Sequence, residues 1–324
     1  TNPNAYNEFL QGRYFEALGS LEGSEQAADF YQAALASDPE YSPAWSALAN
    51  NYVSQAIRGY GDWKSLFELA RGAAYRALAI NPEGALSHAA LGSIALTFDR
   101  ALSAAAIHLQ RALRLEPKDR VVLNRVTMFL DSVGRFQDSI RLREQLTESD
   151  PVNAAMHHNL GYSYFTNEQW QQSIESFKTA LRLSPGAAGT HFLISIAYVA
   201  MNDLSGASTQ IQLEVVDPLR AIGTAVIHFE LNEVEESDRT AEQVARDFPE
   251  WAYNIAQLHA ARGENDKAFY FLDKAIELDD PGLAEAPHFP MLNTLHGDAR
   301  WTGFLKKIGH SPELLATIEF SLSP

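Results

Sequence analysis

The residues of this sequence that could support chemistry are few and poorly spaced for it. His157 and His158 are adjacent, but neighbouring side chains on a helix point about 100° apart, so the two are not placed to share one metal ion. Gly59 and Gly61 are not followed by a basic residue, so they do not form a phosphate-binding loop. Neither an HExxH nor a Gly-x-Ser-x-Gly motif occurs. We therefore expect no catalytic, cofactor-binding or metal-binding residues, and a protein that is not an enzyme.

The composition is that of a folded protein that avoids polyanions. There are 41 acidic and 25 basic side chains, which give a formal charge of -16. This charge repels phosphate backbones and anionic lipids, so we expect no contact with nucleic acid. Cysteine is absent, which excludes disulfides and thiol catalysis. The most apolar window, residues 187–201, is shorter than the roughly 20 residues needed to cross a bilayer, so we expect no membrane insertion by this region.

A regular spacing of prolines is the strongest signal in the sequence. Most intervals in one series of prolines are 31 to 35 residues, and the first interval is 43 residues. A period of about 34 residues is typical of a helix-turn-helix repeat, in which proline follows the second helix because it cannot continue one. The series is Pro39, Pro82, Pro117, Pro151, Pro185, Pro218, Pro249 and Pro281.

Other positions recur in phase with these prolines. The clearest copy places Leu160, Gly161 and Tyr164 on one face of a first helix, and Phe177 and Ala180 on the facing side of a second helix. A small residue at the position of Gly161 lets the two helices approach closely. The pattern resembles the tetratricopeptide repeat family over nearly the whole chain. This resemblance implies an all-α, right-handed superhelical solenoid of helix-turn-helix repeats.

The repeats should fill most of the chain. We expect about eight units over residues 1–281, each ending near a proline of the series, because the period is about 34 residues. The longer first interval should place an insertion near residues 58–63. The pattern stops after Pro281, and a solenoid must cover the apolar face of its last repeat. We therefore expect residues 282–324 to form a C-terminal capping segment.

The expected cap contains two different parts. Pro287 and Pro290 indicate a loop over residues 284–295, because proline interrupts regular helix. Residues 298–308 have helical apolar spacing and should form a short helix. We expect its Trp301 and Phe304 side chains to be buried against the last repeat.

The two ends of the chain resemble a narrower group of proteins. The motifs that carry this resemblance are residues 279–283, 290–295 and 298–309 at the end, and residues 5–14 at the start. They are similar to the repeat regions of bacterial multidomain signalling proteins. There, an N-terminal winged-helix DNA-binding domain or nucleotide cyclase is often joined to the repeats through a membrane span. The resemblance implies a scaffold that regulates an effector absent from this chain. Such a scaffold lies on the periplasmic side if it is tethered by a span, and in the cytoplasm otherwise.

In tetratricopeptide proteins the first helices line a concave groove. The large packing position of successive units is occupied by Trp45, His88, Leu123, His157 and His191. Residues one, five and eight positions further along should face the groove, because steps of three and four stay on one side of a helix. The candidate partner-binding residues at these positions are Asn50, Asn124, His158, Tyr162, Phe165, Phe192 and Ile196.

The expected groove admits two interpretations. Its aromatic residues could anchor a peptide or protein partner, or a neighbouring helix or the C-terminal tail could cover them. Chaperone-binding relatives use lysine to hold a peptide carboxylate, and Ser46 stands in that place here. We expect a non-enzymatic protein-protein interaction module. The alternative is an oligomerisation module that self-associates, for example as a homodimer.

Overall fold

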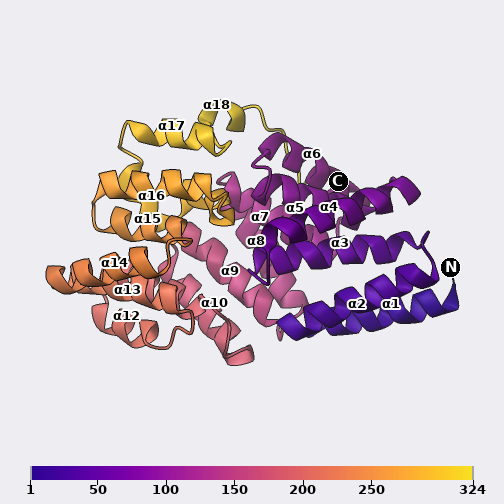
Figure 1. The fold of residues 1–324 in the computed structure, drawn as a ribbon, viewed down its shortest axis with the longest axis horizontal. Helices are drawn as coiled ribbons and strands as arrows, with labels where there is room; N and C mark the ends of the chain where they lie inside the picture. Colours follow the sequence, from indigo (N-terminus) through magenta and orange to yellow (C-terminus); the bar gives the residue numbers. More distant parts are fainter. Residues whose placement is uncertain (1, 323–324) are drawn as a thin grey trace. The chain divides into compact units, whose positions relative to one another are not determined.

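The computed structural model describes residues 2–322, and Figure 1 shows that α-helices make up most of them. No residue in this range lies in a β-strand, which confirms the predicted all-α class. Two compact units can be distinguished: unit 1 comprises the described residues up to Phe129 and those from Pro312 onward, and unit 2 runs from Leu130 to Ser311. Residues 282–311 of the expected cap therefore belong to unit 2. Thr1, Ser323 and Pro324 lie outside the described residues.

Unit 1 is built from consecutive helix pairs. The two helices of each pair pack together, and the first helix of a pair also packs against the second helix of the pair before it, as α3 does on α2 and α5 does on α4. Its helices are α1 (Pro3–Ala17), α2 (Leu21–Ser37), α3 (Ser42–Ile57), α4 (Trp63–Ile80), α5 (Ala85–Thr97), α6 (Leu102–Leu115) and the short α18 (Pro312–Leu315). The helix α7 (Arg120–Ser132) contributes to both units.

Unit 2 continues the same arrangement and adds an irregular segment. Its helices are α8 (Phe136–Ser149), α9 (Ala154–Thr166), α10 (Trp170–Leu183), α11 (Thr190–Ala200), α12 (Leu204–Ile211), α13 (Asp217–Glu230), α14 (Val234–Asp247), α15 (Ala252–Ala261), α16 (Asn265–Glu277) and α17 (Arg300–Lys307). Three short 3-10 helices precede α17: η1 (Pro281–Ala284), η2 (Ala286–His288) and η3 (Pro290–Leu295). The prediction of a loop over residues 284–295 was therefore wrong, because each proline there occupies the first turn of a short helix, where its missing N–H costs nothing.

One proline of the repeat series has a different role from the others. Pro218 lies in the first turn of α13 instead of after a second helix. The preceding second helix, α12, ends early at Ile211. Proline is tolerated at the start of a helix because the first N–H groups have no intrahelical acceptor. The proline spacing is kept at this position, although the proline begins a helix here instead of following one.

The large packing position ties each first helix to the turn before it. The ring nitrogens of Trp45 and His157 donate to the carbonyl oxygen of the proline six residues earlier, Pro39 or Pro151, at 2.9 Å. The Nε2 atom of His88 lies 3.3 Å from the Pro82 carbonyl oxygen in the same way. These histidines are packing residues that hold a turn.

Small residues allow the two helices of a pair to approach closely. A Cβ atom added to Gly161 in α9 would lie 2.7 Å from the Phe177 ring of α10. A Cβ added to Gly92 in α5 would lie 2.6 Å from Leu109 of α6. Both distances are shorter than van der Waals contact, so only glycine fits without a shift of the partner. The close approach predicted for this repeat position is confirmed.

The helix α17 covers the end of the last pair in unit 2. The side chains of Trp301 and Phe304 are 7% and 3% exposed and belong to the apolar core of the unit, which confirms their predicted burial. At the rim of this contact, Arg300 lies 2.8 Å from Asp266 of α16. Along the described chain, no helix has both the length and the hydropathy to span a bilayer.

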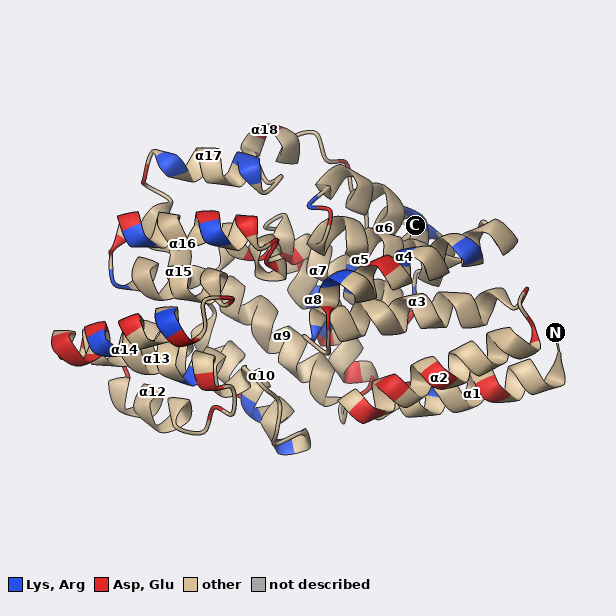
Figure 2. Cartoon of the chain, viewed as in Figure 1, with Lys and Arg blue, Asp and Glu red and all other residues tan. Residues whose placement is uncertain are grey.

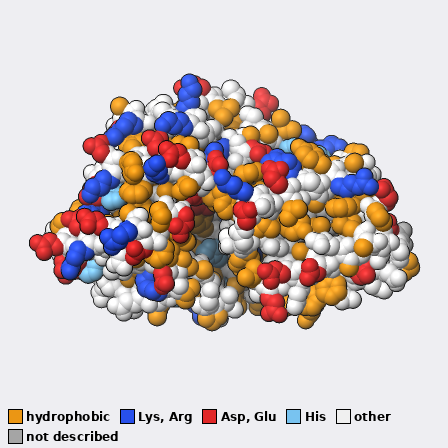
Figure 3. All heavy atoms as spheres, in the orientation of Figure 1, with side chains coloured by type: hydrophobic (Ala, Val, Ile, Leu, Met, Phe, Trp, Pro, Cys, Tyr) orange, Lys and Arg blue, Asp and Glu red, His pale blue; other side chains and the backbone are white. Residues whose placement is uncertain are grey.

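The second helices of unit 2 carry mixed charges on their outer faces. Figure 2 shows basic and acidic residues interspersed along α14 and α16, and Figure 3 shows both signs mixed on the molecular surface. An example is the exposed pair Arg239–Glu236, whose charged atoms are 2.7 Å apart. Exposed pairs of this kind stabilise a fold by at most about 1 kcal/mol. We interpret these faces as solvated surface.

The close approach at Gly161 predicts a difference between two glycine substitutions. Gly161→Ala should destabilise the protein by about 1–3 kcal/mol, because its Cβ would press on the Phe177 ring. Gly72→Ala, on an exposed face of α4 with open space around it, should instead stabilise by about 0.5–1 kcal/mol. Urea unfolding followed by circular dichroism measures both changes. Midpoint shifts of the same sign and size would contradict the close approach.

Candidate functional site

The first helices of unit 2, α9, α11, α13 and α15, form one face of the unit, which we call the first-helix face. On α9, residues three apart lie on one side of the helix, which brings Tyr162 and Phe165 together. Their rings are stacked with centroids 6.4 Å apart. The side chain of Phe165 is fully buried, whereas that of Tyr162 is half-buried.

The three 3-10 helices lie against this face as one segment, residues 281–295. The Tyr162 hydroxyl donates a hydrogen bond of 2.6 Å to the Glu285 carboxylate. The Phe289 ring lies between two aromatic rings, with centroids 5.5 Å from Phe165 of α9 and 6.4 Å from Tyr253 of α15. The segment therefore bridges two first helices that are far apart in the sequence.

Polar contacts hold the end of the segment. The Asn293 side chain donates to the Glu168 carboxylate at 2.7 Å. The Thr294 hydroxyl donates to the carbonyl oxygen of Ala260 in α15 at 2.8 Å. Because Glu168, Asn293 and Thr294 are exposed, these bonds lie at the rim, while the apolar contacts lie beneath.

The start of α8 and the turn before it contact the middle of the segment. The His288 ring packs edge-on against Phe136, with ring centroids 5.2 Å apart. A Cβ atom on Gly134 would lie 3.2 Å from the His288 ring, and Gly134 has a φ of +75°. Glycine is therefore required at this position for both its conformation and its lack of a side chain.

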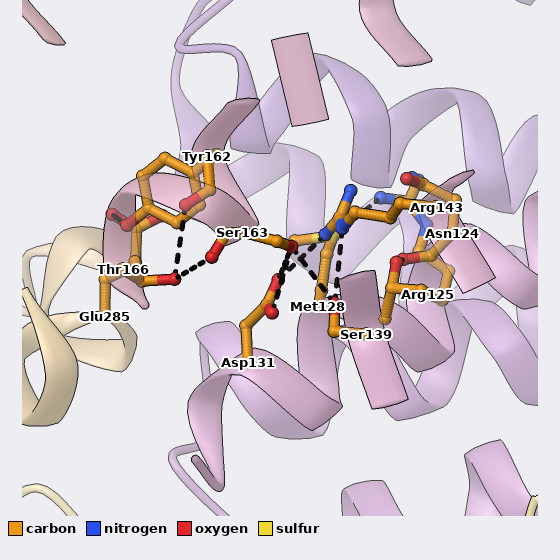
Figure 4. A network of polar contacts seen from close by, with 11 residues as sticks. Asn124, Arg125, Met128, Asp131, Ser139, Arg143, Tyr162, Ser163, Thr166 and Glu285 are labelled. Carbon is orange, nitrogen blue, oxygen red and sulfur yellow. Dashed lines mark hydrogen bonds and ion pairs between the residues drawn. The ribbon is translucent and has the colours of Figure 1, made fainter. Parts of the chain in front are cut away.

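A buried ion pair supports α9 from below, as Figure 4 shows. The Arg143 guanidinium of α8 lies 3.0 Å from the Asp131 carboxylate, and both side chains are less than a tenth exposed. The Ser163 hydroxyl of α9 donates to the same carboxylate at 3.0 Å. Ser163 directly follows Tyr162, so this pair fixes the helix that presents Tyr162 to the segment.

The surroundings of the Tyr162–Glu285 bond shift both pKa values upward. The Glu285 side chain reaches the surface, but desolvation of the part that contacts the protein raises the pKa of its carboxyl. The nearby charges of Asp131 and Asp280 raise this pKa further. Burial also raises the pKa of the Tyr162 hydroxyl well above its usual value. The hydroxyl therefore keeps its proton at neutral pH and acts as the donor in this bond.

Comparison with known proteins places this repeat in a family. A family model described as tetratricopeptide repeat matches residues 130–188 and 223–282, which lie in unit 2. These two stretches of unit 2 therefore match the tetratricopeptide repeat family. No curated protein sequence matches it significantly.

Solved structures of low sequence identity share the fold. PilW, a widely conserved type IV pilus biogenesis factor, is 16% identical with a TM-score of 0.52, over 63% of this chain and 94% of that protein. Human IFIT1, solved as a dimer with m7Gppp-AAAA, is 13% identical with a TM-score of 0.58, over 85% of this chain and 72% of that protein. At these identities the likeness concerns the tetratricopeptide fold alone.

The candidate residues of the two middle repeats have different surroundings. Only Tyr162 and Phe165 contact segment 281–295 through the bonds and rings described above. Phe192 and Ile196 are 3% and 4% exposed within the core of unit 2. A Cβ atom added to Gly223 of α13 would lie 3.4 Å from the Phe192 ring, so the two helices are in contact here. The C-terminal tail does cover part of the predicted aromatic stripe, which was one of the two interpretations left open by the sequence.

The remaining candidates make contacts within the fold. The His158 ring bonds the Thr190 hydroxyl at 3.0 Å. In unit 1, the Asn50 side chain is buried and donates to the carbonyl oxygens of Ser46 and Leu86 at 2.9 and 2.8 Å. Asn124, also in unit 1, is half-buried on α7. The structure therefore brings together Tyr162 and Phe165, and it places Asn50 in a separate unit.

Several residues of this site carry no signal in the repeat pattern. They lie in the irregular segment or contact it from positions that are 36 to 125 residues away in the sequence. The missed residues are Glu168, Tyr253, Glu285, Phe289 and Asn293. The unusual density of apolar residues between Pro281 and Leu295 is the signal that could have indicated a buried segment there.

The chemistry of the site is that of binding. Its aromatic rings, carboxylates and amides can hold a peptide chain by apolar contact and hydrogen bonds. Nowhere in residues 2–322 do three His, Asp or Glu side chains gather in a way that could hold a metal ion.

The buried ion pair predicts a strong dependence on both partners. Arg143→Met should destabilise the protein by about 3–5 kcal/mol, because Asp131 would remain buried without its counter-charge. Adding Asp131→Leu should recover most of this loss, because apolar replacement of a whole buried pair is often neutral. Urea unfolding measures both changes. The exposed Arg239→Met is the control, with a cost below about 1 kcal/mol, and a loss for Arg143→Met no larger than this would contradict the account.

Proposed function

We propose that this chain is a protein-interaction scaffold whose first-helix face in unit 2 binds a peptide or protein partner. One observation carries the proposal: this face already holds an irregular segment of 15 residues through aromatic and hydrogen-bonding side chains. A surface that binds one short segment by side-chain anchors has the properties needed to bind another. The tetratricopeptide fold supports the same class of function.

The charge of the chain favours a protein partner over a nucleic acid. IFIT1 shares the fold and was solved with m7Gppp-AAAA. The present chain carries a formal charge of -16, which opposes contact with phosphates. Its anchors at this face are Tyr162, Phe165 and Tyr253, and aromatic residues dominate protein interfaces.

We further propose that partner binding regulates an effector domain elsewhere in a longer protein. The support is the resemblance of residues 279–283 and 298–309 to the repeat regions of bacterial signalling proteins. In that arrangement the scaffold senses a partner and passes its occupancy to a winged-helix domain or a nucleotide cyclase. A ligand can do so only if it binds two states of the protein with different affinity.

Locking the segment in place should block partner binding. The chain contains no cysteine, so Glu168→Cys and Asn293→Cys can be joined selectively by a short thiol-reactive cross-linker. Peptides selected from a random library on the unmodified chain should lose about ten-fold or more in affinity once the link is made. Fluorescence anisotropy with the full chain measures this loss.

The matched control links two exposed residues on a second helix. Gln171 and Glu175 of α10 are hydrogen-bonded at 2.9 Å, and the same cross-link there should leave peptide affinity unchanged. The unlinked double-cysteine chain controls for the substitutions themselves. Equal affinity of the locked and unlocked chains would refute binding at this face, and it would favour the alternative of self-association, which light scattering detects.

A further inference from the structure

We propose that the first-helix face of unit 2 recognises short, proline-containing segments that place a carboxylate four residues before an aromatic ring and eight residues before an amide. Segment 281–295 is the resident occupant of this site, and a partner segment with the same side chains replaces it. This inference rests on the proposed function and adds the chemical class of the partner.

The anchors of the segment are in register with α9. Three of its side chains, spaced four residues apart, contact three side chains that are spaced three residues apart on α9 and in the turn that follows it. The pairs are Glu285 with Tyr162, Phe289 with Phe165, and Asn293 with Glu168. Both chains run in the same direction through these contacts. A regular register of this kind defines which side chains a competing segment must carry, and at which spacing.

The second wall of the site, α15, follows the same direction. The Tyr253 ring packs directly on the Gly282 backbone so closely that a Cβ atom there would overlap the ring. Further along, Ala260 accepts the bond from Thr294. The two walls therefore hold the beginning and the end of one continuous segment, with Phe289 between them.

The backbone of the segment satisfies many of its own hydrogen bonds. The N–H groups of Leu283, Glu285, His288 and Leu292 each donate to the carbonyl oxygen three residues earlier. The segment is therefore not held by a backbone ladder to its walls. Side chains carry most of its recognition, so a different chain with the same side chains can take its place.

Two ion pairs join the helices on either side of the segment without involving it. The segment is part of the connection between α16 and α17. Arg300 and Lys307 of α17 lie 2.8 and 2.7 Å from Asp266 and Asp273 of α16. Trp301 is buried in the core of the unit. Replacement therefore needs a loop to open, with the cap still docked.

The resident segment is not an optimal ligand for its own site. The Nε2 atom of His288 is buried without a hydrogen-bond partner among the described residues. An unpaired buried polar atom weakens binding, because it loses water and gains nothing in return. A partner segment with an apolar residue before its aromatic anchor avoids this loss and competes favourably.

The test adds the segment to the protein as a separate peptide. A fluorescent peptide with the sequence of residues 281–295 is titrated into the full chain and into its Phe289→Ala variant, whose walls are unchanged. The variant should bind about ten-fold or more tightly than the parent, because its resident segment has lost the central anchor. Peptides with Ala for the glutamate or for the phenylalanine should bind about ten-fold more weakly, and Leu for the histidine should bind at least as well.

A second variant keeps the test valid if Phe289→Ala fails to fold. Glu285→Ala combined with Asn293→Ala removes the two exposed polar anchors and leaves the core intact. Circular dichroism and tryptophan fluorescence establish that a variant is folded. Equal peptide binding to parent and folded variant, or no loss with the altered peptides, would overturn the inference.

Competition between library peptides and the 281–295 peptide distinguishes failure of this inference from failure of the proposed function. Library peptides that bind only the unlocked chain but do not compete with the 281–295 peptide would refute the stated chemistry and leave the function standing. Library peptides that bind the locked chain equally would remove both.

Discussion

The packing of Phe289 between Phe165 and Tyr253 is the contact on which the rest of unit 2 depends. The two wall residues belong to α9 and α15, which are separated by two complete helix pairs in the sequence. Burial of a large aromatic side chain stabilises a fold by about 1.5–3 kcal/mol. A single residue of an irregular segment therefore links the first-helix face across several repeats, and the polar contacts of Glu285 and Asn293 set its register.

The repeats supply the geometry that this contact requires. Glycine at position 161 brings α10 close to α9, and the buried Asp131–Arg143 pair holds Ser163 on the same helix. These constraints fix the direction in which Tyr162 and Phe165 point. A buried ion pair adds little net stability but is costly to break, so it acts here as a positional restraint. The first-helix face therefore depends on the packing of α9 against its neighbours as well as on the residues that contact the segment.

The parts of the structure that arise from local interactions could be predicted from the sequence. The proline period, the small residues of first helices such as Gly161, and the apolar spacing of Trp301 and Phe304 each involve residues within one or two adjacent repeats. Helical phase indicated the side of α9 on which Tyr162 lies. It did not indicate the burial of Phe192, because phase alone does not show how closely two helices approach.

The position of segment 281–295 could not be predicted, because its partners are remote and non-periodic. Glu285 bonds a tyrosine 123 residues earlier, and Asn293 bonds a glutamate 125 residues earlier. A sequence can show that a stretch such as 281–295 is apolar and proline-rich, but the surface that it covers follows only from the folded chain. The role of Pro218 illustrates the same limit, since the period is intact there while the proline opens a helix instead of following one.

Hydrogen exchange of the segment tests its docking on the first-helix face most directly. The backbone amides of residues 282–295 are measured by mass spectrometry in the full chain and in a free peptide of the same sequence. The account predicts exchange slower by about ten-fold or more in the full chain, because the amides lie in 3-10 turns packed against α9 and α15. Exchange as fast as in the free peptide, while the helices of unit 2 remain protected, would contradict it.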